Sequence, residues 1–561
     1  MTDLELSRSV SPRPIIQVGE ELGLRPDELI PYGTAKAKVS LAALERVADR
    51  PLGRYVLVTA MNPTPLGEGK TTTSIGVAMG LCRLGKRAVV TLRQPSLGPV
   101  FGIKGGGTGG GRAQVIPMEE INLHFTGDAH AVAAAHNLLS AFVDNSLFHG
   151  NNLNLDPTMI TWPRAMGVSD RALREVLLES SDGVPARRAQ FVITEASEVM
   201  AILALASGWA DLRRRLGRII VGFTRDGRPV GADDLKCAGG MAVLLREALC
   251  PNLVQTLEGT PALIHSGPFG NIAHGNSSIL GDAVALHCAD YVVTEAGFGS
   301  ELGAEKFFNL KCRVSGFKPA AGVIVATLRA LKLHGGGGMI KGGMPLPAGL
   351  TGPNREALKQ GLANLAQHLA NVRAFGIPVV VAINAFKDDP REELETVRKW
   401  ALEAGAAGSA VSTQWADGGE GAVELAKAVI SACDQPASYA PLYRDDAPIK
   451  EKIEVIARRM YGAGAVQYAD QAEVQIEAAA KLGFGTFPIC MAKTPLSLSH
   501  DPKLTGRPSG FTLPIRDLRI LAGAGFLTAI CSGTQLMPGL PTRPAGERID
   551  LDSQTGEIVG L

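Results

Sequence analysis

The sequence predicts an α/β protein of the P-loop NTPase type, in which helices cover both faces of a mostly parallel sheet. Short apolar runs rich in β-branched residues alternate with helix-length amphipathic stretches over most of the chain. These runs are hydrophobic almost without interruption, which is typical of strands buried on both faces. A glycine-rich loop that ends in Gly-Lys-Thr stands between one such run and a helical stretch. Together these three observations favour a parallel sheet with a phosphate-binding loop.

Six apolar runs are the expected strands of this sheet. They are Tyr55–Met61, Arg87–Leu92, Arg218–Phe223, Tyr291–Gly297, Gly322–Leu328 and Ile377–Asn384. The clearest helical patterns between them are Thr72–Leu84 and Asn354–Phe375. Gly85 is expected to end the first of these helices, because glycine adopts the left-handed conformation of a helix C-terminus without a steric penalty. Two further helices, Ile449–Tyr461 and Ala469–Leu482, are expected near the C-terminus.

The length of 561 residues exceeds what one ordinary core holds and predicts about three or four domains. The stretch Gly335–Pro353 is dense in glycine and proline and indicates a boundary near residue 350. After Pro436 the pattern becomes mixed. We therefore expect a first domain of residues 1–350, a second α/β domain of residues 351–440, and a C-terminal subdomain of residues 441–561.

The composition narrows the class of protein. With 56 Lys and Arg against 55 Asp and Glu, the formal charge is +1, so no net field favours nucleic acid or an anionic membrane. The N-terminus carries no secretory h-region and no later stretch is apolar for long enough to span a bilayer, so we expect a cytoplasmic protein. The eight cysteines are scattered, which favours small buried side chains over disulfides or metal half-sites.

The loop after the strand Tyr55–Met61 has the residue types of a site that binds a nucleoside triphosphate. It reads Thr64, Pro65, Leu66, Gly67, Glu68, Gly69, Lys70 and Thr71, with Thr64 in the place of the first glycine of a Walker A loop. Gly67 and Gly69 let backbone N–H groups turn toward phosphate at a helix N-terminus. Lys70 supplies a cation for the β- and γ-phosphates, and Thr71 a hydroxyl for Mg²⁺. The alternative is a glycine turn that merely connects strand to helix.

Two strand ends offer further polar groups at the same edge of the sheet. Glu295 ends the strand Tyr291–Gly297 and is a candidate for the Mg²⁺ site, with a structural carboxylate as the alternative. Asn384 ends the strand Ile377–Asn384, where its amide could bind the adenine of ATP. Ligands collect at the carboxyl ends of strands in open parallel sheets, so both residues are expected near the phosphate loop.

A second anion site is expected directly after the strand Arg87–Leu92. Arg93 follows this strand, and six glycines lie within Gly105–Gly111 between Lys104 and Arg112. Arg93 can hold an anion through two hydrogen bonds, and backbone amides next to glycine can add more. These groups suit a small carboxylate or an acyl phosphate. The alternative for the glycine run is a flexible linker.

Seven motifs in register carry a resemblance to a known family. TPLGEGKTTT, LRQPSLGPVFGIKGG, INLHFTGD, NLVQTLE, VVTEAGFGSELGAEKF, ALKLHGG and MPGLP follow one another from Thr64 to Pro541. Together they resemble formate–tetrahydrofolate ligase, also called 10-formyltetrahydrofolate synthetase. The resemblance covers essentially the whole chain, and seven spaced motifs are far more specific than one glycine loop.

The resemblance implies an enzyme that uses ATP to join formate to N10 of tetrahydrofolate, giving 10-formyltetrahydrofolate, ADP and phosphate through formyl phosphate. By resemblance, residues 64–71 form the ATP phosphate loop with Lys70 as its cation, and Arg93 holds formyl phosphate. Residues 1–350 then bind nucleotide and formyl phosphate, and residues 351–440 contribute to folate and adenine binding. The family also implies a homotetramer, and the near-neutral charge predicts no nucleic-acid or membrane partner.

Two pairs of residues receive roles from the resemblance. Phe298 and Trp415 are similar to the aromatic pair that holds the pterin ring in this family, whereas the sequence alone favours two core aromatics. His124 and His130 lie near Asp128 and could orient formyl phosphate or move the N10 proton, with structural hydrogen bonding as the alternative. Their six-residue spacing does not place them on one helical face, so a catalytic metal site is not expected.

Departures from the family pattern leave two alternatives open. Gln94 stands where relatives usually have a glutamate linked to a monovalent cation, so cation activation is doubtful, and Met491–Ser499 lacks an amide and two aromatics. These changes would fit a P-loop ligase acting on another small carboxylate. A nucleotide-binding relative without catalysis is the second alternative, against which the intact phosphate loop and Arg93 argue.

Overall fold

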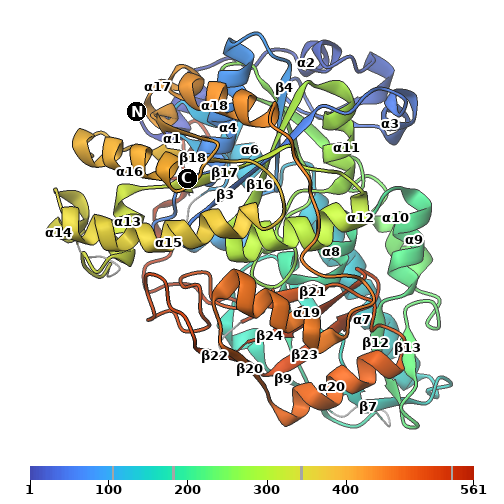
Figure 1. The fold of residues 1–561 in the computed structure, drawn as a ribbon. Helices are drawn as coiled ribbons and strands as arrows, with labels where there is room; N and C mark the ends of the chain where they lie inside the picture. The colour runs from blue at the N-terminus through green and yellow to red at the C-terminus, as the bar shows by residue number, and fades with distance from the viewer. Residues whose placement is uncertain (104–105, 180–183, 341–344, 532–534) are drawn as a thin grey trace.

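A computed structural model describes residues 1–103, 106–179, 184–340, 345–531 and 535–561 (Figure 1). Its centre is a twelve-stranded sheet, most of which is parallel and covered by helices. This confirms the predicted α/β class. The parallel part runs in the order β15 (Pro261–Ile264), β4 (Ala88–Leu92), β16 (Tyr291–Gly299), β3 (Arg54–Ala60), β17 (Ala321–Ala326), β18 (Val379–Asn384) and β19 (Gly408–Ser412).

One edge of the sheet is antiparallel, which we did not predict. The strands there are β1 (Leu29–Pro31), β2 (Ala37–Val39) and β14 (Asn252–Thr256); β6 (Ala113–Ile116) pairs with β14, and β5 (Gly109–Gly110) pairs with β6. Polar residues Asn252, Gln255 and Thr256 interrupt the hydrophobic pattern of β14, although all three are buried in the fold. A hydrophobic-run criterion therefore misses this strand.

The two faces of the sheet bury alternate residues of each strand. Val56 and Val58 of β3 lie on one face of the sheet, in a core that also contains residues of one pair of helices. Tyr55 and Leu57 lie on the other face, in a core that contains residues of a second pair. The first pair is α4 (Lys70–Arg83) and α18 (Val423–Cys433), and the second is α11 (Ile279–Cys288) and α15 (Arg355–Arg373). Burial on both faces explains why the strands read as continuous apolar runs.

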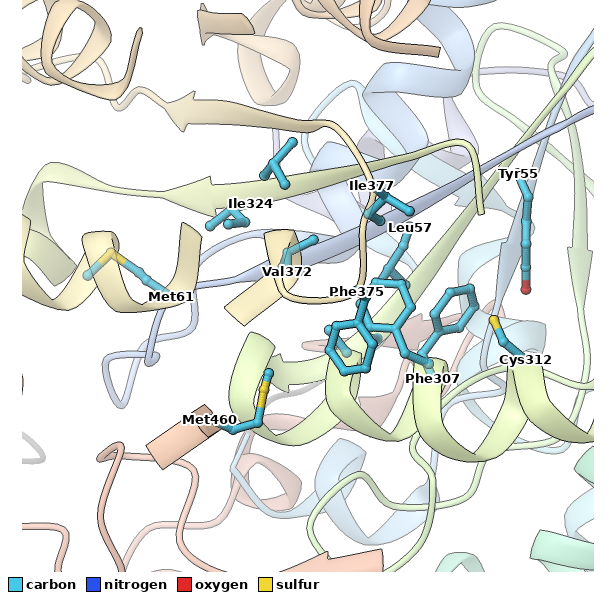
Figure 2. Close-up of a cluster of buried hydrophobic side chains, with 14 of the residues drawn as sticks. Tyr55, Leu57, Met61, Phe307, Cys312, Ile324, Val372, Phe375, Ile377 and Met460 are labelled. Carbon is cyan, nitrogen blue, oxygen red and sulfur yellow. The ribbon is translucent and has the colours of Figure 1, made fainter. Parts of the chain in front are cut away.

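The core on the α15 face contains a cluster of aromatic side chains. Figure 2 shows Leu57 and Ile324 of the sheet together with Phe307 and Phe375. The ring of Phe375 stacks on Phe308 with centroids 4.2 Å apart. Phe307 and Phe308 lie in a fully buried helical segment of wide turns that follows β16, formed by η4 (Ser300–Ala304) and η5 (Phe307–Cys312). The predicted helix Asn354–Phe375 is confirmed as α15, with Asn354 as its N-cap.

The prediction for Arg218–Phe223 is wrong in its place in the fold. The run forms β12 (Ile220–Thr224), which pairs antiparallel with β13 (Pro229–Gly231) and β7 (Leu155–Ile160) in a separate three-stranded sheet. Val221 is buried, but Ile220 and Phe223 are only half-buried. An apolar run therefore does not distinguish a strand buried on both faces from one that is covered on a single face.

The strands predicted for a separate domain of residues 351–440 continue the central sheet, since β18 and β19 lie beside β17. The division into three domains stays a prediction. Residues 449–530 of the C-terminal segment pack on the α15 face of the sheet, and Figure 1 shows them as the orange and red group at the end away from α16–α18. Its elements are α19 (Ile449–Ile456), η7 (Ala457–Tyr461), α20 (Asp470–Lys481), β20 (Ala465–Tyr468), β21 (Ile489–Ala492), β22 (Thr512–Ile515), β23 (Asp517–Leu521) and β24 (Phe526–Ile530).

The cysteines have the environment that their spacing predicts. All eight lie in the described part of the chain as free thiols, and seven of them are buried. Burial raises the pKa of these thiols, for example that of Cys433 to about 12, which keeps them protonated and unreactive. Among the described residues, no helix is both long enough and apolar enough to cross a bilayer.

Candidate active site

The phosphate loop connects β3 to α4, as predicted. Helix α4 begins at Lys70, two residues earlier than expected, and Gly69 is its N-cap with a φ of 73°. Gly67 also has a positive φ, of 81°. A Cβ atom on Gly69 would lie 2.5 Å from the Nδ2 atom of Asn384, so only glycine fits there. Lys70 and Thr71 therefore occupy the first turn of the helix, where unpaired backbone N–H groups attract phosphate.

Glu68 shapes this loop from inside. Its side chain is buried, and its Oε1 atom accepts a hydrogen bond of 2.6 Å from the backbone N–H of Thr64. Its other carboxylate oxygen accepts a hydrogen bond from the hydroxyl of Thr327, at the end of β17. The carboxylate thus closes the loop on itself and joins it to the neighbouring strand, a role that the sequence pattern did not reveal.

Three of the predicted residues meet at the carboxyl ends of adjacent parallel strands. The hydroxyl of Thr71 donates to the carboxylate of Glu295 at 2.7 Å, and the Nη2 atom of Arg93 lies 3.7 Å from the same carboxylate. Glu295 lies within β16, between β3 and β4, at the point where the regular pairing of β16 with β3 is interrupted. Phosphate loop, carboxylate and arginine therefore converge, as expected at this edge of a parallel sheet.

The same residues offer oxygen atoms of the kind that Mg²⁺ binds. Mg²⁺ in nucleotide sites binds one or two protein oxygens together with phosphate oxygens and water, and the hydroxyl of Thr71 and the carboxylate of Glu295 fit this donor set. Among the described residues, no group of three or more His, Cys, Asp or Glu side chains could hold a metal by itself. A cation at Thr71 and Glu295 would therefore depend on the bound nucleotide.

Arg93 points into this site past a glycine. A Cβ atom on Gly297 would lie 3.2 Å from both Nη atoms of Arg93, so the missing side chain leaves room for the guanidinium. The Nη1 atom donates to the carbonyl oxygen of Pro268 at 3.3 Å. The Nε atom is buried and has no hydrogen-bond partner in the described part of the chain. A ligand anion would complete the hydrogen bonds of this side chain.

Gln94 turns its amide into the protein. Its backbone N–H donates to the carbonyl oxygen of Ser266 at 2.6 Å, and its side chain is 6% exposed. Neither Oε1 nor Nε2 of the side chain has a partner among the described residues. The buried carboxyl of Glu195 lies next to the same turn, close to the hydroxyl of Ser96.

Glu195→Gln is expected to gain stability relative to the unmodified protein as the pH rises. Burial raises the pKa of Glu195 from 4.5 to about 7, an increase that the Ser96 hydroxyl partly offsets. The neutral carboxyl makes its full contribution to stability below pH 4.5, the pKa in the unfolded chain. This contribution is lost as the pH rises through about 7, the pKa in the folded protein. That loss amounts to about 3 kcal/mol. Thermal melts of both proteins at about pH 5 and about pH 8 measure it, because glutamine cannot ionise; an equal difference in Tm at both pH values would contradict the prediction.

A cavity of about 1100 Å³ extends from the phosphate loop. Its lining consists of loop and helix residues Leu66, Gly67, Gly69 and Thr72, of Arg329, and of residues from the segments 384–395 and 411–417. Trp415 lines this cavity with a side chain that is 57% exposed. The predicted partner Phe298 is not in the lining of the described cavity; it ends β16 with a φ of 61°, and its ring lies against Gly270.

Phe386 is the aromatic residue that the sequence reasoning missed. It lines the same cavity as Trp415, and the guanidinium of Arg329 lies 3.9 Å from its ring centre. The signal was available, because Phe386 follows Asn384 at the end of a predicted strand. Asn384 also lines the cavity, but its Nδ2 atom donates to the carbonyl of Glu68 at 3.2 Å and its Oδ1 accepts from Gln414 at 3.0 Å. The amide thus braces the phosphate loop, and adenine recognition by it stays a prediction.

Two amides of the glycine run bond to other parts of the protein, and anion binding by the run stays a prediction. The amide of Gly107 donates to Asn122 at 2.8 Å and that of Gly111 donates to Asp3 at 2.9 Å, so neither is available to an anion. A Cβ atom on Gly111 would lie 2.0 Å from the carbonyl oxygen of Trp415. Gly111 therefore lets the Trp415 segment pack closely. Lys104 and Gly105, which we expected at the same anion site, lie outside the described residues.

The two candidate histidines lie at the surface. His124 precedes α7 (Asp128–Phe148), His130 is in its first turn, and both side chains are exposed. Asp128, which we expected to face them, is buried and forms an ion pair with Lys38 at 2.7 Å. A catalytic role for His124 and His130 stays a prediction.

Comparison with known proteins adds full-length matches. A family model described as formate–tetrahydrofolate ligase matches residues 1–561. A protein named formate–tetrahydrofolate ligase from Roseiflexus sp. (strain RS-1) is 55% identical, with all of both chains covered. Proteins of the same name from Desulforamulus reducens and Saccharopolyspora erythraea are each 53% identical, covering all of this chain and 99% of theirs.

Proposed function

We infer, from the premise that this chain belongs to the formate–tetrahydrofolate ligase family, that it catalyses the ATP-dependent ligation of formate to tetrahydrofolate. The products are 10-formyltetrahydrofolate, ADP and phosphate. The main support for placing this reaction at the phosphate loop is that Thr71, Glu295 and Arg93 converge beside it. The full-length matches do not favour the alternatives of another carboxylate or a non-catalytic relative.

In the first step, a carboxylate oxygen of formate attacks the γ-phosphorus of ATP, and ADP leaves. Formate is a poor electrophile, and this transfer gives formyl phosphate, from which phosphate departs readily. Phosphoryl transfer gathers charge on the equatorial oxygens, which Lys70 and the first-turn amides of α4 stabilise. Arg93 is the guanidinium beside this site, and it holds formate and then formyl phosphate through its unsatisfied donors.

In the second step, N10 of tetrahydrofolate attacks the formyl carbon, phosphate leaves, and N10 loses its proton. Arg93 remains on the phosphate as its negative charge grows. Bound Mg²⁺ would supply charge neutralisation on the nucleotide phosphates, and Thr71 and Glu295 are the residues that would hold it. His124 and His130 remain candidates for the N10 proton.

We propose that the pterin ring binds in the cavity between the phosphate loop and Trp415, with Phe386 as the second aromatic contact. Both aromatic side chains line this one cavity, which supports the pairing. A flat heterocycle beside two aromatic rings gains contact area and a defined orientation. The earlier pairing of Trp415 with Phe298 lacks this support, because Phe298 is outside the described lining.

Trp415→Ala is expected to raise the KM for tetrahydrofolate by about tenfold and to change kcat little, because stacking contributes similarly to the ground state and the transition state. Phe386→Ala should act in the same way, and Phe298→Ala should leave this KM within about twofold. Initial rates at varied tetrahydrofolate and saturating ATP and formate measure the effect. A change in the KM for ATP alone would assign Trp415 to the nucleotide instead.

The function is tested by measuring ADP release from ATP and Mg²⁺ with formate, with tetrahydrofolate, and with both. Turnover should require formate, and stoichiometric 10-formyltetrahydrofolate should form only when both substrates are present. Turnover that ignores formate would overturn the ligase assignment. Turnover with a different small acid would support the alternative of a ligase that acts on another carboxylate.

We also propose Mg²⁺ dependence, a homotetramer and a cytoplasmic location, each on the family resemblance. The thiol chemistry is compatible with a reducing compartment, since all eight cysteines are free. Activation by a monovalent cation is doubtful because Gln94 carries no charge. Size-exclusion chromatography with light scattering tests the tetramer.

A further inference from the structure

Asn62 lies two residues before the phosphate loop, and hydrogen bonds hold it at every polar atom. Asn62 is fully buried, and its backbone N–H lies 2.9 Å from Nε2 of His368. Its carbonyl oxygen accepts from Nε2 of His334 at 3.1 Å, and its Oδ1 accepts from Asn364 at 3.0 Å. Its Nδ2 donates to Glu301 at 2.8 Å. The start of the loop therefore has one fixed position relative to its surroundings.

The helices that hold Asn62 also hold the rest of the loop. Helix α13 (Leu328–His334) contributes His334 at its end, and Thr327 at its N-cap bonds to the loop carboxylate Glu68. Helix α13 packs closely on α15, since a Cβ atom on Gly361 would lie 1.8 Å from the carbonyl oxygen of Leu331. The two helices thus form one clamp that contacts both ends of the loop.

Within this clamp, His368 makes the contact with the loop backbone. It is fully buried in α15, with Nδ1 at 2.8 Å from the hydroxyl of Ser300 and Nε2 facing the N–H of Asn62. Nε2 lies 2.9 Å from the backbone nitrogen of Asn62 and 3.0 Å from its Oδ1. In the neutral ring with the proton on Nδ1, Nε2 accepts from the backbone N–H; in the other tautomer it donates to Oδ1. The first of these contacts is the one that reaches the loop backbone. Burial holds the pKa of His368 well below its usual range, which keeps the ring neutral.

The clamp also reaches the C-terminal segment. The Glu301 carboxylate that accepts from Asn62 forms a buried ion pair with Lys493 at 3.4 Å, and the carbonyl of Pro495 accepts a second bond from Asn62 at 3.1 Å. The backbone N–H of Gly506 donates to Nδ1 of His334 at 3.2 Å. Residues 493–506 are therefore part of the same support, although they lie more than 400 positions from the loop in sequence.

We propose that His368 is a positioning residue of the enzyme: by accepting the backbone N–H of Asn62, it fixes the point from which the phosphate loop starts. The proposal rests on the proposed function only in that the loop binds a nucleotide. Phosphoryl transfer is sensitive to placement, since a misplacement of about 1 Å costs about 10²-fold in rate. The effect of losing this contact should therefore appear in nucleotide binding and phosphoryl transfer before it appears in folate binding.

Two polar variants separate positioning from packing. In His368→Gln the amide reaches the place of Nε2 and can still accept from Asn62, whereas in His368→Asn it reaches only the place of Nδ1. We expect H368N to weaken Mg²⁺–ADP binding by about tenfold and to lower kcat/KM for ATP by about 100-fold, with the KM for tetrahydrofolate unchanged. H368Q should stay within about threefold of the unmodified enzyme in both quantities.

His136→Asn is the matched control. His136 is equally buried, with two hydrogen bonds of 2.7 and 2.9 Å to Ser197 and Pro163, but it lies on α7 and contacts neither loop nor clamp. H136N should lower Tm as much as H368N and leave ADP binding unchanged. Normal ADP affinity in H368N, or an equal loss in H368Q, would overturn the proposal.

A second variant covers the case in which H368N does not fold. Asn364→Leu removes the donor to the Asn62 side chain at similar volume and should also weaken ADP binding; a folded N364L with normal ADP affinity would overturn the proposal. Calorimetric ADP binding needs neither formate nor tetrahydrofolate. A failure of the ligase function would therefore show as formate-independent turnover, and a failure of the positioning role as unchanged ADP affinity.

Discussion

Lys70→Ala is expected to lower kcat for ADP formation by about 10³-fold or more, while the fold stays intact. Lys70 is the first residue of α4, directly after the left-handed Gly69, so it sits where the helix N-terminus and the loop meet. The negative charge on the transferring phosphoryl group is spread over its oxygens in the transition state. A cation placed there lowers the barrier by several kcal/mol, whereas the helix amides that remain still bind the nucleotide.

The effect should fall on kcat more than on ADP affinity. Initial rates with formate and tetrahydrofolate, together with calorimetric ADP binding, separate the two quantities. Lys86→Ala is a suitable control, because Lys86 follows the same helix at its other end and is exposed. Near-normal turnover in K70A would show that the phosphoryl group is transferred elsewhere.

The parallel centre of the fold and the strand–loop–helix unit of β3 and α4 could be predicted because both are local signals, whereas phosphate binding by this loop stays a prediction. The strand β3, the glycines at Gly67 and Gly69 and the helix α4 are consecutive in the chain, and each has a direct physical reason. The antiparallel edge was missed, since β14 buries polar residues whose partners come from distant segments. Asn252, for example, donates to the carboxylate of Asp128 at 2.7 Å.

The predicted site residues differ in the same way. Arg93 and Glu295 could each be placed at the carboxyl edge of the sheet, because each stands at the end of an apolar run, although the sequence assigned them to two separate sites. Phe386 was missed because the cavity shared with Trp415 depends on how two distant loops pack. His368 was missed because nothing in a helical pattern shows that one of its buried positions bonds to a loop about 300 residues earlier. Long-range hydrogen bonds of this kind leave no periodic trace in a sequence.

Arg93→Ala is expected to lower kcat/KM for formate by between about 10² and 10³-fold at saturating ATP and tetrahydrofolate. The guanidinium has a buried Nε without a partner in the described residues, a weak bond of 3.3 Å to a carbonyl and an ion pair of 3.7 Å with Glu295, so the Nε at least is available to an anion. Arg93→Lys keeps the charge but loses the planar fork, and it should restore only part of the activity.

Gly297→Ala tests the same side chain without removing it. The new methyl group would lie 3.2 Å from both Nη atoms of Arg93, which is tighter than ordinary contact, so the guanidinium must shift. We expect a smaller loss of kcat/KM for formate than in R93A, about tenfold, with ADP binding unchanged. Because Arg93 also lies beside the buried Glu295, thermal melts must accompany the kinetics. A lower Tm with an unchanged kcat/KM for formate in both variants would reduce Arg93 to a partner of Glu295 and would remove it from the binding of formyl phosphate.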